Sequence, residues 1–542
     1  MKIRPFLTLA LLGLLASPAS AKDHVLTIGG GYSPSGNQVS LERNIVFFRK
    51  LLAEQLPAGT PHDLYFADGD SPNPDLQFLP KDAKVPKANL LAAALFGSTK
   101  NLNLQYRNNE LKDVRGPSSP QELEAWFKDS GSKLVAGDRL ILYITAHGGR
   151  SSSKSNKGNT KIYMWNNQSV EAAKLAGYIN DLPEGVGVTT VMVQCYSGGF
   201  ANLIFEEADP KKAVVNRDIC GFYATVHDRV AAGCTADINE EDYDEYSSHF
   251  WAALRGKTRI EKDVTRPDYD GDGLVSFEEA HAFTVLTSES LDIPVKTSGA
   301  FLRRHSKMEE KDKDGLLHAE KTPYFQILTH ARPAELAVLD SLSARLRMTS
   351  PNRGEEARKK AEEIAKTRKD LEGKSKEKKK LIDAHRKEIS RDLRNRWPQL
   401  SNHFSPGAVE LIHSQADEFV KAAESHPKYA EWTKLTKERN KIEAERFGLE
   451  KRWAHFKRFS RTLENVALAA NLDQFAKPEV VTRYQKLLAA EAAAFSKPAP
   501  APEPAPPSPV ATDEPKPKPA EEEKTQAPPA PEKQDKAEVT AS

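Results

Sequence analysis

The sequence predicts an α/β protein with a mostly parallel sheet, followed by an all-α helical module and a proline-rich tail. Residues 22–330 alternate short apolar runs with helical patterns, residues 331–496 are almost wholly helical in pattern, and residues 497–542 hold 13 of the 35 prolines. Repeated strand–helix–strand order is typical of a parallel sheet covered on both faces. The tail is rich in Pro, Ala, Glu and Lys, which cannot bury a core, so we expect it to be disordered.

Length and composition narrow the class of protein. A chain of 542 residues is too long for one hydrophobic core. The net charge is +2, from 78 Lys and Arg against 76 Asp and Glu, which disfavours a globally basic nucleic-acid binder. The three cysteines are too few for a disulfide-dense scaffold and form no zinc-type cluster.

Residues 1–21 have the pattern of a secretory signal peptide. Lys2 and Arg4 precede an apolar run over residues 6–15, and small residues at 19–21 form a cleavage signal. We expect cleavage after Ala21 and a secreted or periplasmic mature protein; an uncleaved anchor is the alternative. No later segment reaches about 18 consecutive apolar residues, so no transmembrane segment is expected in the mature chain.

Five apolar runs in residues 22–330 predict strands, and four amphipathic patterns between them predict helices. The predicted strands are His24–Ile28, Asp63–Phe66, Leu140–Thr145, Thr189–Gln194 and Gly221–Thr225. The predicted helices are Leu41–Gln55, Pro120–Asp129, Val170–Asn180 and Tyr246–Arg255.

The pattern of the second half of the chain predicts a helical bundle. Leucines recur at helical spacing from Leu336 to Leu346, and apolar residues recur every seven positions from Leu435 to Leu463. The stretch Arg353–Arg396 holds 17 basic and 10 acidic residues. This excess indicates either a solvated helix face or an anionic partner. An envelope or protein partner of the helical module or the tail stays open.

Two predicted strands run directly into side chains that are typical of catalysis. One strand leads into His147-Gly148-Gly149, and another leads into Cys195, 48 residues later. Because parallel strands end at one edge of a sheet, the two side chains are expected to meet. His147 can activate the Cys195 thiol, and the N–H groups of Gly148 and Cys195 can stabilise an oxyanion. The alternative is a structural cysteine and an ordinary loop histidine.

The blocks Ile144–Gly148 and Gln194–Gly198 resemble the caspase-like clan of cysteine peptidases, and within it most closely the legumain-type family. The resemblance implies a caspase-like α/β/α sandwich and hydrolysis of a peptide or protein substrate through a thioester. It makes Cys195 the nucleophile and His147 the acid/base. The family's Asn near the catalytic His matches Asn37, but the Arg that helps it to select Asn is not matched.

The segment after the strand at Gly221 corresponds to the specificity region of this clan. An acidic run follows it, comprising Asp237, Glu240, Glu241, Asp242, Asp244 and Glu245. It indicates either an acidic pocket for Lys or Arg or an exposed acidic loop. Cys220 and Cys234 bracket this segment, and we expect them to pair and leave Cys195 free; two reduced thiols are the alternative.

Residues 268–279 match the calcium loop of an EF-hand at each required position. The expected ligands are Asp268, Asp270, Asp272, the carbonyl of Leu274, Ser276 and Glu279. Flanking helical patterns extend this to an EF-hand-like segment over residues 260–325. A second loop from Glu310 ends in Lys321 and is expected to bind weakly or not at all. We expect structural Ca²⁺ in the first loop; an unoccupied acidic turn is the alternative.

Together these features predict a secreted or periplasmic cysteine endopeptidase with a calcium loop and a helical C-terminal module. A non-catalytic envelope scaffold that keeps a peptidase-like domain is one alternative. A transpeptidase or transamidase is the other, because an amine can replace water as the attacker of the same thioester.

Overall fold

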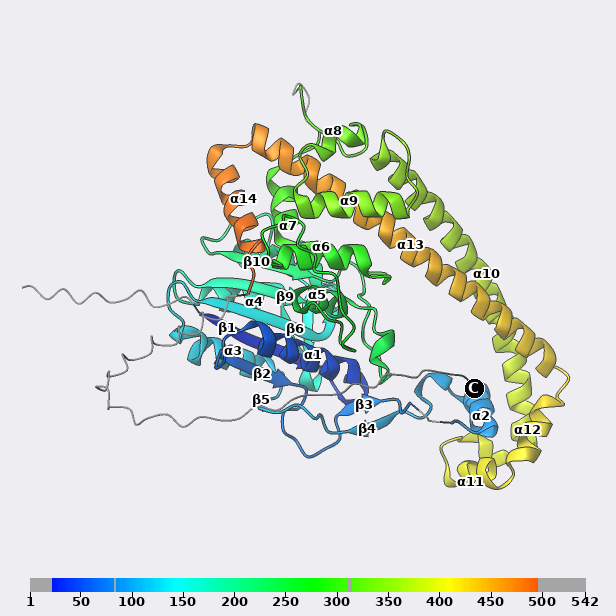
Figure 1. Ribbon diagram of the computed structural model, residues 1–542. Coiled ribbons are helices and arrows are strands. Elements are labelled where there is room, and N and C mark those ends of the chain that lie inside the picture. The colour runs from blue at the N-terminus through cyan, green and yellow to red at the C-terminus, as the bar shows by residue number, and fades with distance from the viewer. Residues whose placement is uncertain (1–21, 82–83, 310–313, 496–542) are drawn as a thin grey trace, which may run out of the picture. The chain divides into compact units, whose positions relative to one another are not determined.

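The computed structural model describes residues 22–81, 84–309 and 314–495 (Figure 1). The predicted signal peptide, the predicted tail and part of the second acidic loop lie outside these residues. The main sheet has nine strands, with β11-β10-β9-β6-β1-β2-β5 as its path and β7 and β8 as an extension of β6. The strands of this sheet are β1 (Asp23–Gly30), β2 (His62–Phe66), β5 (Val114–Gly116), β6 (Arg139–Gly149), β7 (Lys161–Met164), β8 (Gln168–Glu171), β9 (Gly187–Met192), β10 (Ile219–Tyr223) and β11 (Val295–Lys296). A separate two-stranded sheet joins β3 (Leu76–Phe78) to β4 (Gln105–Arg107).

The central strands β1, β6, β9 and β10 pair in parallel, and only β11 and the β7–β8 extension run antiparallel in this sheet. In β6 the residues from Leu140 to Ala146 are all buried, which fits a strand covered on both faces. The five predicted strands are therefore confirmed, each within two residues of its predicted ends except that β6 continues four residues past Thr145 to Gly149.

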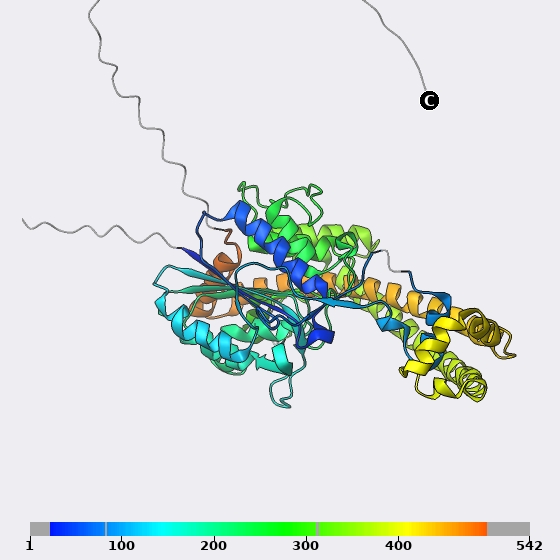
Figure 2. The same ribbon diagram turned by 90° about the horizontal axis from the view of Figure 1, so that it is seen from below.

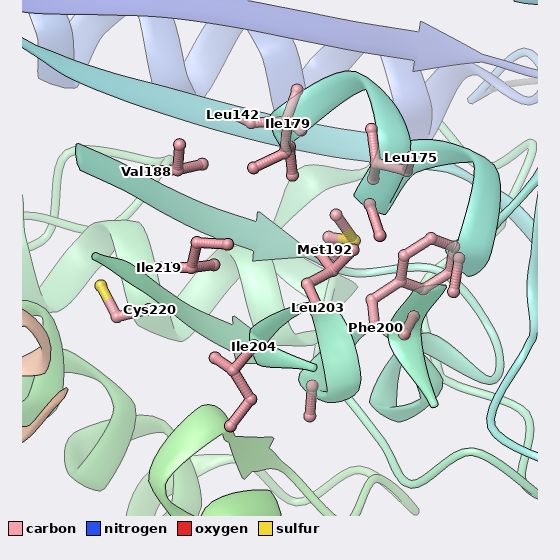
Figure 3. Packing of buried hydrophobic residues seen from close by; sticks show 14 of the residues in the cluster. Leu142, Leu175, Ile179, Val188, Met192, Phe200, Leu203, Ile204, Ile219 and Cys220 are labelled. Carbon is pink, nitrogen blue, oxygen red and sulfur yellow. The ribbon is translucent and has the colours of Figure 1, made fainter. Parts of the chain in front are cut away.

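Helices cover both faces of the sheet, as the repeated strand–helix order predicted (Figure 2). Beside the sheet lie α1 (Val39–Gln55), α3 (Pro120–Asp129), α4 (Ala172–Asn180), α5 (Tyr246–Arg255), α6 (Phe277–Thr287) and α7 (Thr297–His305). Two further helices pack away from the sheet: α2 (Lys87–Phe96) shares a core with Leu393 and Phe419, and α8 (Tyr324–Leu328) shares one with Leu339 and Phe459 (Figure 1). Helices α1, α5 and α6 pack on one face through a core that includes Phe48 and Trp251. Helices α3, α4 and α7 pack on the other through a core that includes Leu175 and Phe301 (Figure 3).

Most of residues 332–495 are helical, as predicted. They form α9 (Pro333–Arg345), α10 (Arg353–Arg396), α11 (Pro406–Ser414), α12 (Ala416–Glu424), α13 (Tyr429–Phe475) and α14 (Pro478–Glu491). The long helices α10 and α13 lie side by side (Figure 1) and are joined by pairs such as Lys378–Glu438 at 2.5 Å. Leu472 of α13 and Leu487 of α14 belong to the same core as the sheet. Among residues 22–81, 84–309 and 314–495, no helix has both the length and the apolar character of a membrane-spanning segment.

Candidate active site

The ends of β6 and β9 bring His147 and Cys195 to one edge of the sheet. The two strands pair in parallel with Ile144 opposite Met192. Each candidate residue lies three positions beyond that pair. A side chain at Gly148 would place its Cβ 1.9 Å from the Cys195 carbonyl oxygen, so the two backbones are in direct contact there. Gly148 is thus a position where only glycine allows the strand ends to approach.

The His147 ring is fixed by two oxygen acceptors. Its Nε2 lies 2.8 Å from the Gly36 carbonyl oxygen and 2.9 Å from Gln38 Oε1. Because both partners can only accept at these atoms, we assign the proton to Nε2, which leaves Nδ1 as the unprotonated base. The Tyr32 ring packs edge-on against the imidazole, with centroids 5.2 Å apart. Sequence reasoning did not assign this role to Gly36 or Gln38.

Asn37 lies in the expected loop, between the two residues that contact the His147 ring, but its own side chain bonds elsewhere. It is fully buried, and its Oδ1 accepts a hydrogen bond from the Gly31 N–H at 2.9 Å. Its Nδ2 donates to Asp75 Oδ2 at 3.1 Å. Among the described residues, no hydrogen bond joins it to His147. Asn37 therefore positions the loop that carries Gly36 and Gln38.

Two neighbouring carboxyl groups, those of Asp75 and Asp68, lie next to Asn37. Asp75 is 1% exposed, and Oδ1 of Asp75 and Oδ1 of Asp68 are buried without a partner in the described part of the chain. Burial and the neighbouring Asp68 raise the pKa of Asp75 to about 7. The two carboxyl groups can share a proton near neutral pH. Sequence analysis did not identify this pair, because Asp75 lies in a loop with no motif.

Cys195 sits at a sharp turn after β9. The next residue, Tyr196, has a φ of 61°, and its N–H donates to the Arg229 carbonyl at 2.8 Å. The Ala231 N–H points at Cys195 Sγ, at 3.3 Å. The segment from Arg229 to Ala231 thereby lies against the thiol.

Burial favours the neutral forms of both the thiol and the imidazole. Burial raises the pKa of Cys195, although the hydrogen bond at Ala231 opposes that effect. Burial lowers the pKa of His147, although its bond to Gly36 opposes that effect. No hydrogen bond joins Sγ to the ring within the described residues. This arrangement suits proton transfer from thiol to imidazole during attack rather than a preformed ion pair.

The predicted Cys220–Cys234 disulfide is wrong for this structure, which holds all three cysteines as free thiols. Cys220 lies near the start of β10, buried in the core (Figure 3), where its Sγ donates to the Ala490 carbonyl at 3.4 Å. Cys234 is exposed and comes after the other end of β10. The strand between them carries the two thiols to different ends of the sheet.

The acidic run after Cys234 is largely neutralised by neighbouring cations. Glu245 pairs with Arg259 at 3.0 Å, and Glu241 pairs with Lys262 at 2.7 Å. Further pairs join Asp244 to His249 at 2.9 Å and Glu240 to Arg43 and Arg259 at 3.7 and 3.6 Å. This geometry favours the self-paired acidic loop over an open acidic pocket.

Three of the predicted calcium ligands converge. Carboxylate oxygens of Asp268, Asp270 and Glu279 lie within 4.8 Å of one another. Backbone N–H groups already bind them: Asp268 Oδ1 accepts from Gly271 at 2.8 Å, and Glu279 Oε1 accepts from Tyr269 at 2.6 Å. Oxygen ligands of this kind fit Ca²⁺.

The other predicted ligands have local roles in the same loop. Asp272 Oδ1 accepts from the Leu274 N–H at 2.7 Å, and Ser276 caps α6 in a capping box with Glu279. The exit helix of the predicted EF-hand is thus α6. Residues 257–267, which the structure describes, contain no entering helix: α5 ends at Arg255, and Gly256, with a φ of 77°, caps it twelve residues before the loop.

Helix α13 contacts the segment from Arg229 to Ala231, which lies against the Cys195 thiol. Arg229 pairs with Glu450 at 2.5 Å and stacks on Trp453 at 4.7 Å. The buried Arg458 donates to four backbone carbonyls between residues 285 and 292, including that of Asp292 at 2.7 Å. Asp292 Oδ1 in turn accepts from the Ala232 N–H at 2.8 Å. The helical module therefore contributes to the geometry around Cys195.

Comparison with known proteins identifies no family for this chain. No family model matches the sequence, and no curated protein matches it. Among solved structures, the chain is similar to a structural-genomics protein from Geobacter sulfurreducens at 10% identity and a TM-score of 0.27. That likeness covers 48% of this chain and 88% of the other. A TM-score this low supports no conclusion about fold family or function.

Proposed function

We propose that this chain is a cysteine endopeptidase with a caspase-like α/β/α arrangement, in which Cys195 is the nucleophile and His147 the acid/base. One observation carries the proposal. The two side chains follow neighbouring parallel strands in the same register, and the His147 ring is oriented by the Gly36 carbonyl. A structural cysteine would need neither the histidine nor its fixed tautomer.

The proposed reaction starts from the neutral pair. His147 Nδ1 takes the thiol proton as Sγ bonds to the substrate carbonyl carbon, and the carbonyl oxygen becomes an oxyanion. The Cys195 N–H, which donates to no other residue in the described structure, can stabilise that charge together with the N–H of Gly148. The imidazolium then protonates the leaving amine as the C–N bond breaks. Water, deprotonated by His147, hydrolyses the thioester and restores the thiol.

The test is labelling of the thiol with a peptidyl electrophile. We expect wild-type protein to be labelled at Cys195, and both Cys195→Ala and His147→Ala to lose that labelling. Cys234→Ala is the matched control because Cys234 is the exposed thiol, and it should be labelled as wild type is. Labelling that persists in Cys195→Ala and disappears in Cys234→Ala would overturn the proposal. A folded protein that is never labelled at Cys195 and cleaves nothing would favour the scaffold.

A transpeptidase or transamidase would use the same two residues. It is distinguished by adding an amine nucleophile, such as a glycine peptide, to the cleavage reaction. Hydrolysed product alone supports the endopeptidase, whereas an amide product in near-stoichiometric yield assigns transfer.

We further propose that the enzyme acts after removal of residues 1–21, in a secreted or periplasmic setting, and that Ca²⁺ binds at the loop from Asp268 to Glu279. The convergence of three carboxylates supports the ion. Its role in this proposal is structural, since the loop leads directly into α6, which packs on the sheet through Phe277.

A further inference from the structure

A cavity of about 1090 Å³ opens beside the turn that carries Cys195. One wall is Gly198 with the segment Val226–Arg229, and the facing wall is α13, with Trp453, Lys457 and Arg461. The Gly198 N–H donates to the Thr225 carbonyl at 2.7 Å, so this wall is continuous with the turn after the nucleophile. The cavity exists because the helical module packs against the sheet at this point.

The lining of the cavity is strongly basic. It includes eight Lys and Arg side chains and four Asp and Glu side chains. Two of the four acids are already paired, Glu320 with Arg358 at 2.9 Å and Glu464 with Arg303 at 2.7 Å. Five of the eight cations have no carboxylate within 4.0 Å anywhere in the described residues. These five are Lys157, Lys211, Arg304, Lys457 and Arg461.

Arg461 is the cation whose surroundings most favour a bound anion. It projects from α13 into the cavity, and burial together with the nearby Arg303 lowers its pKa to about 9. Arg461 is partly buried and has no carboxylate within 4.0 Å in the described residues, although the charges of Glu464 and Asp228 reach it from further away. A bound anion would offset the remaining cost of burying its charge. Apolar side chains such as Leu463 and Ile293 line the same space, so a ligand with both apolar and anionic groups fits it.

We propose that this cavity binds an acidic stretch of the polypeptide that is presented to Cys195, an inference that rests on the proposed peptidase function. The volume slightly exceeds the roughly 300–1,000 Å³ of pockets that hold small molecules, which suits a length of extended chain. The position beside the nucleophile turn lets one chain occupy both places. The substrates are then proteins with clustered Asp and Glu near the cleaved bond.

The test measures binding to the full chain carrying Cys195→Ala, so that no cleavage interferes. The probes are three fluorescent peptides that share one central sequence and carry a flanking block of acidic, neutral or basic residues. We expect the acidic peptide to bind on the order of 10-fold more tightly than the neutral one, and the preference to shrink as salt is raised. Lys457→Glu with Arg461→Gln should remove the preference, and the thermal midpoint checks that this variant is folded.

Arg452→Glu is the matched control. Arg452 lies on the same helix, is exposed and does not line the cavity, so its charge reversal should leave the preference intact. Equal binding of acidic and neutral peptides, or loss of the preference in Arg452→Glu alone, would overturn the inference. Inorganic phosphate or a single-stranded oligonucleotide that competes at least as well as the acidic peptide would overturn it in favour of a phosphate ligand.

The inference and the proposed function fail in different ways. Acidic peptides that bind the cavity but are not cleaved by the wild type, with Cys195 never labelled, refute the peptidase and leave the binding site standing. Labelling at Cys195 without any preference for acidic peptides refutes the cavity inference and leaves the peptidase standing.

Discussion

His147 and Cys195 lie at the ends of buried strands, whereas Asp268 and Asp270 lie in a partly exposed loop. The first pair is assembled from positions 48 residues apart by the register of β6 and β9. The second is assembled within twelve residues by N–H groups that bind carboxylates of the same loop. Damage to the sheet edge should therefore spread to neighbouring segments, while damage to the loop should stay local.

The largest effect is expected from Gly148→Ala. Its Cβ would lie 1.9 Å from the Cys195 carbonyl and 2.7 Å from Gln194 Cγ, so the strand ends must separate. A displacement near 1 Å at reacting atoms costs on the order of 100-fold in rate, and overpacking costs about 1–3 kcal/mol of stability. Steady-state cleavage and thermal unfolding measure the two effects.

The control for that change is Gly177→Ala. Gly177 lies in α4, and a Cβ there would meet nothing within 4 Å. This substitution should leave activity unchanged and raise stability by about 0.5–1 kcal/mol. Wild-type rates in Gly148→Ala would contradict the close approach of the two strands as a requirement for activity.

A smaller loss is expected from Gln38→Ala. The change removes one of the two acceptors of His147 Nε2 and keeps the Gly36 carbonyl, so the ring is less firmly oriented. We expect kcat to fall roughly 10-fold with KM nearly unchanged. Ser35→Ala in the same loop is the control, since its Oγ contacts Ser33 and not the ring. A raised KM with unchanged kcat would instead make Gln38 a substrate-binding residue.

Gly148 and Gln38 show which parts of the site could be predicted from the sequence and which could not. Hydrophobic runs predicted the central strands and the edge they share, because burial on both faces leaves a local pattern. His147 and Cys195 were therefore predicted to meet; the structure places both residues just beyond paired strands at the same edge of the sheet, and contact between their side chains stays a prediction. Gln38 and Asp75 were missed as partners, because loop contacts between distant segments leave no periodic signal. The predicted disulfide was wrong because Cys220 and Cys234, although close in the sequence, lie toward opposite ends of β10.

Calcium is expected to act on stability and not on the reacting groups. Adding Ca²⁺ should raise the thermal midpoint by a few degrees, and chelation should reverse the shift, because the ion binds the folded loop. Glu279→Gln should abolish that response, since Glu279 supplies one of the converging carboxylates. Asp314→Asn in the second acidic loop should keep it. If calcium does not change the thermal midpoint of the wild-type protein, the loop is stabilised by its own N–H bonds alone.

The smallest expected effect is a displacement of the pH profile of kcat/KM. His147 must be unprotonated to accept the thiol proton, so activity falls as pH drops through its pKa. Burial lowers that pKa, which places the acid limb below the ordinary value of 6.5. Burial raises the pKa of Cys195, which keeps the thiol protonated until a pH above its ordinary value of 9.0. The plateau is thus broader than for exposed groups, and rate measurements from pH 4 to 10 would reveal it. An acid limb at or above 6.5 would mean that a nearby anion, rather than burial, controls the imidazole.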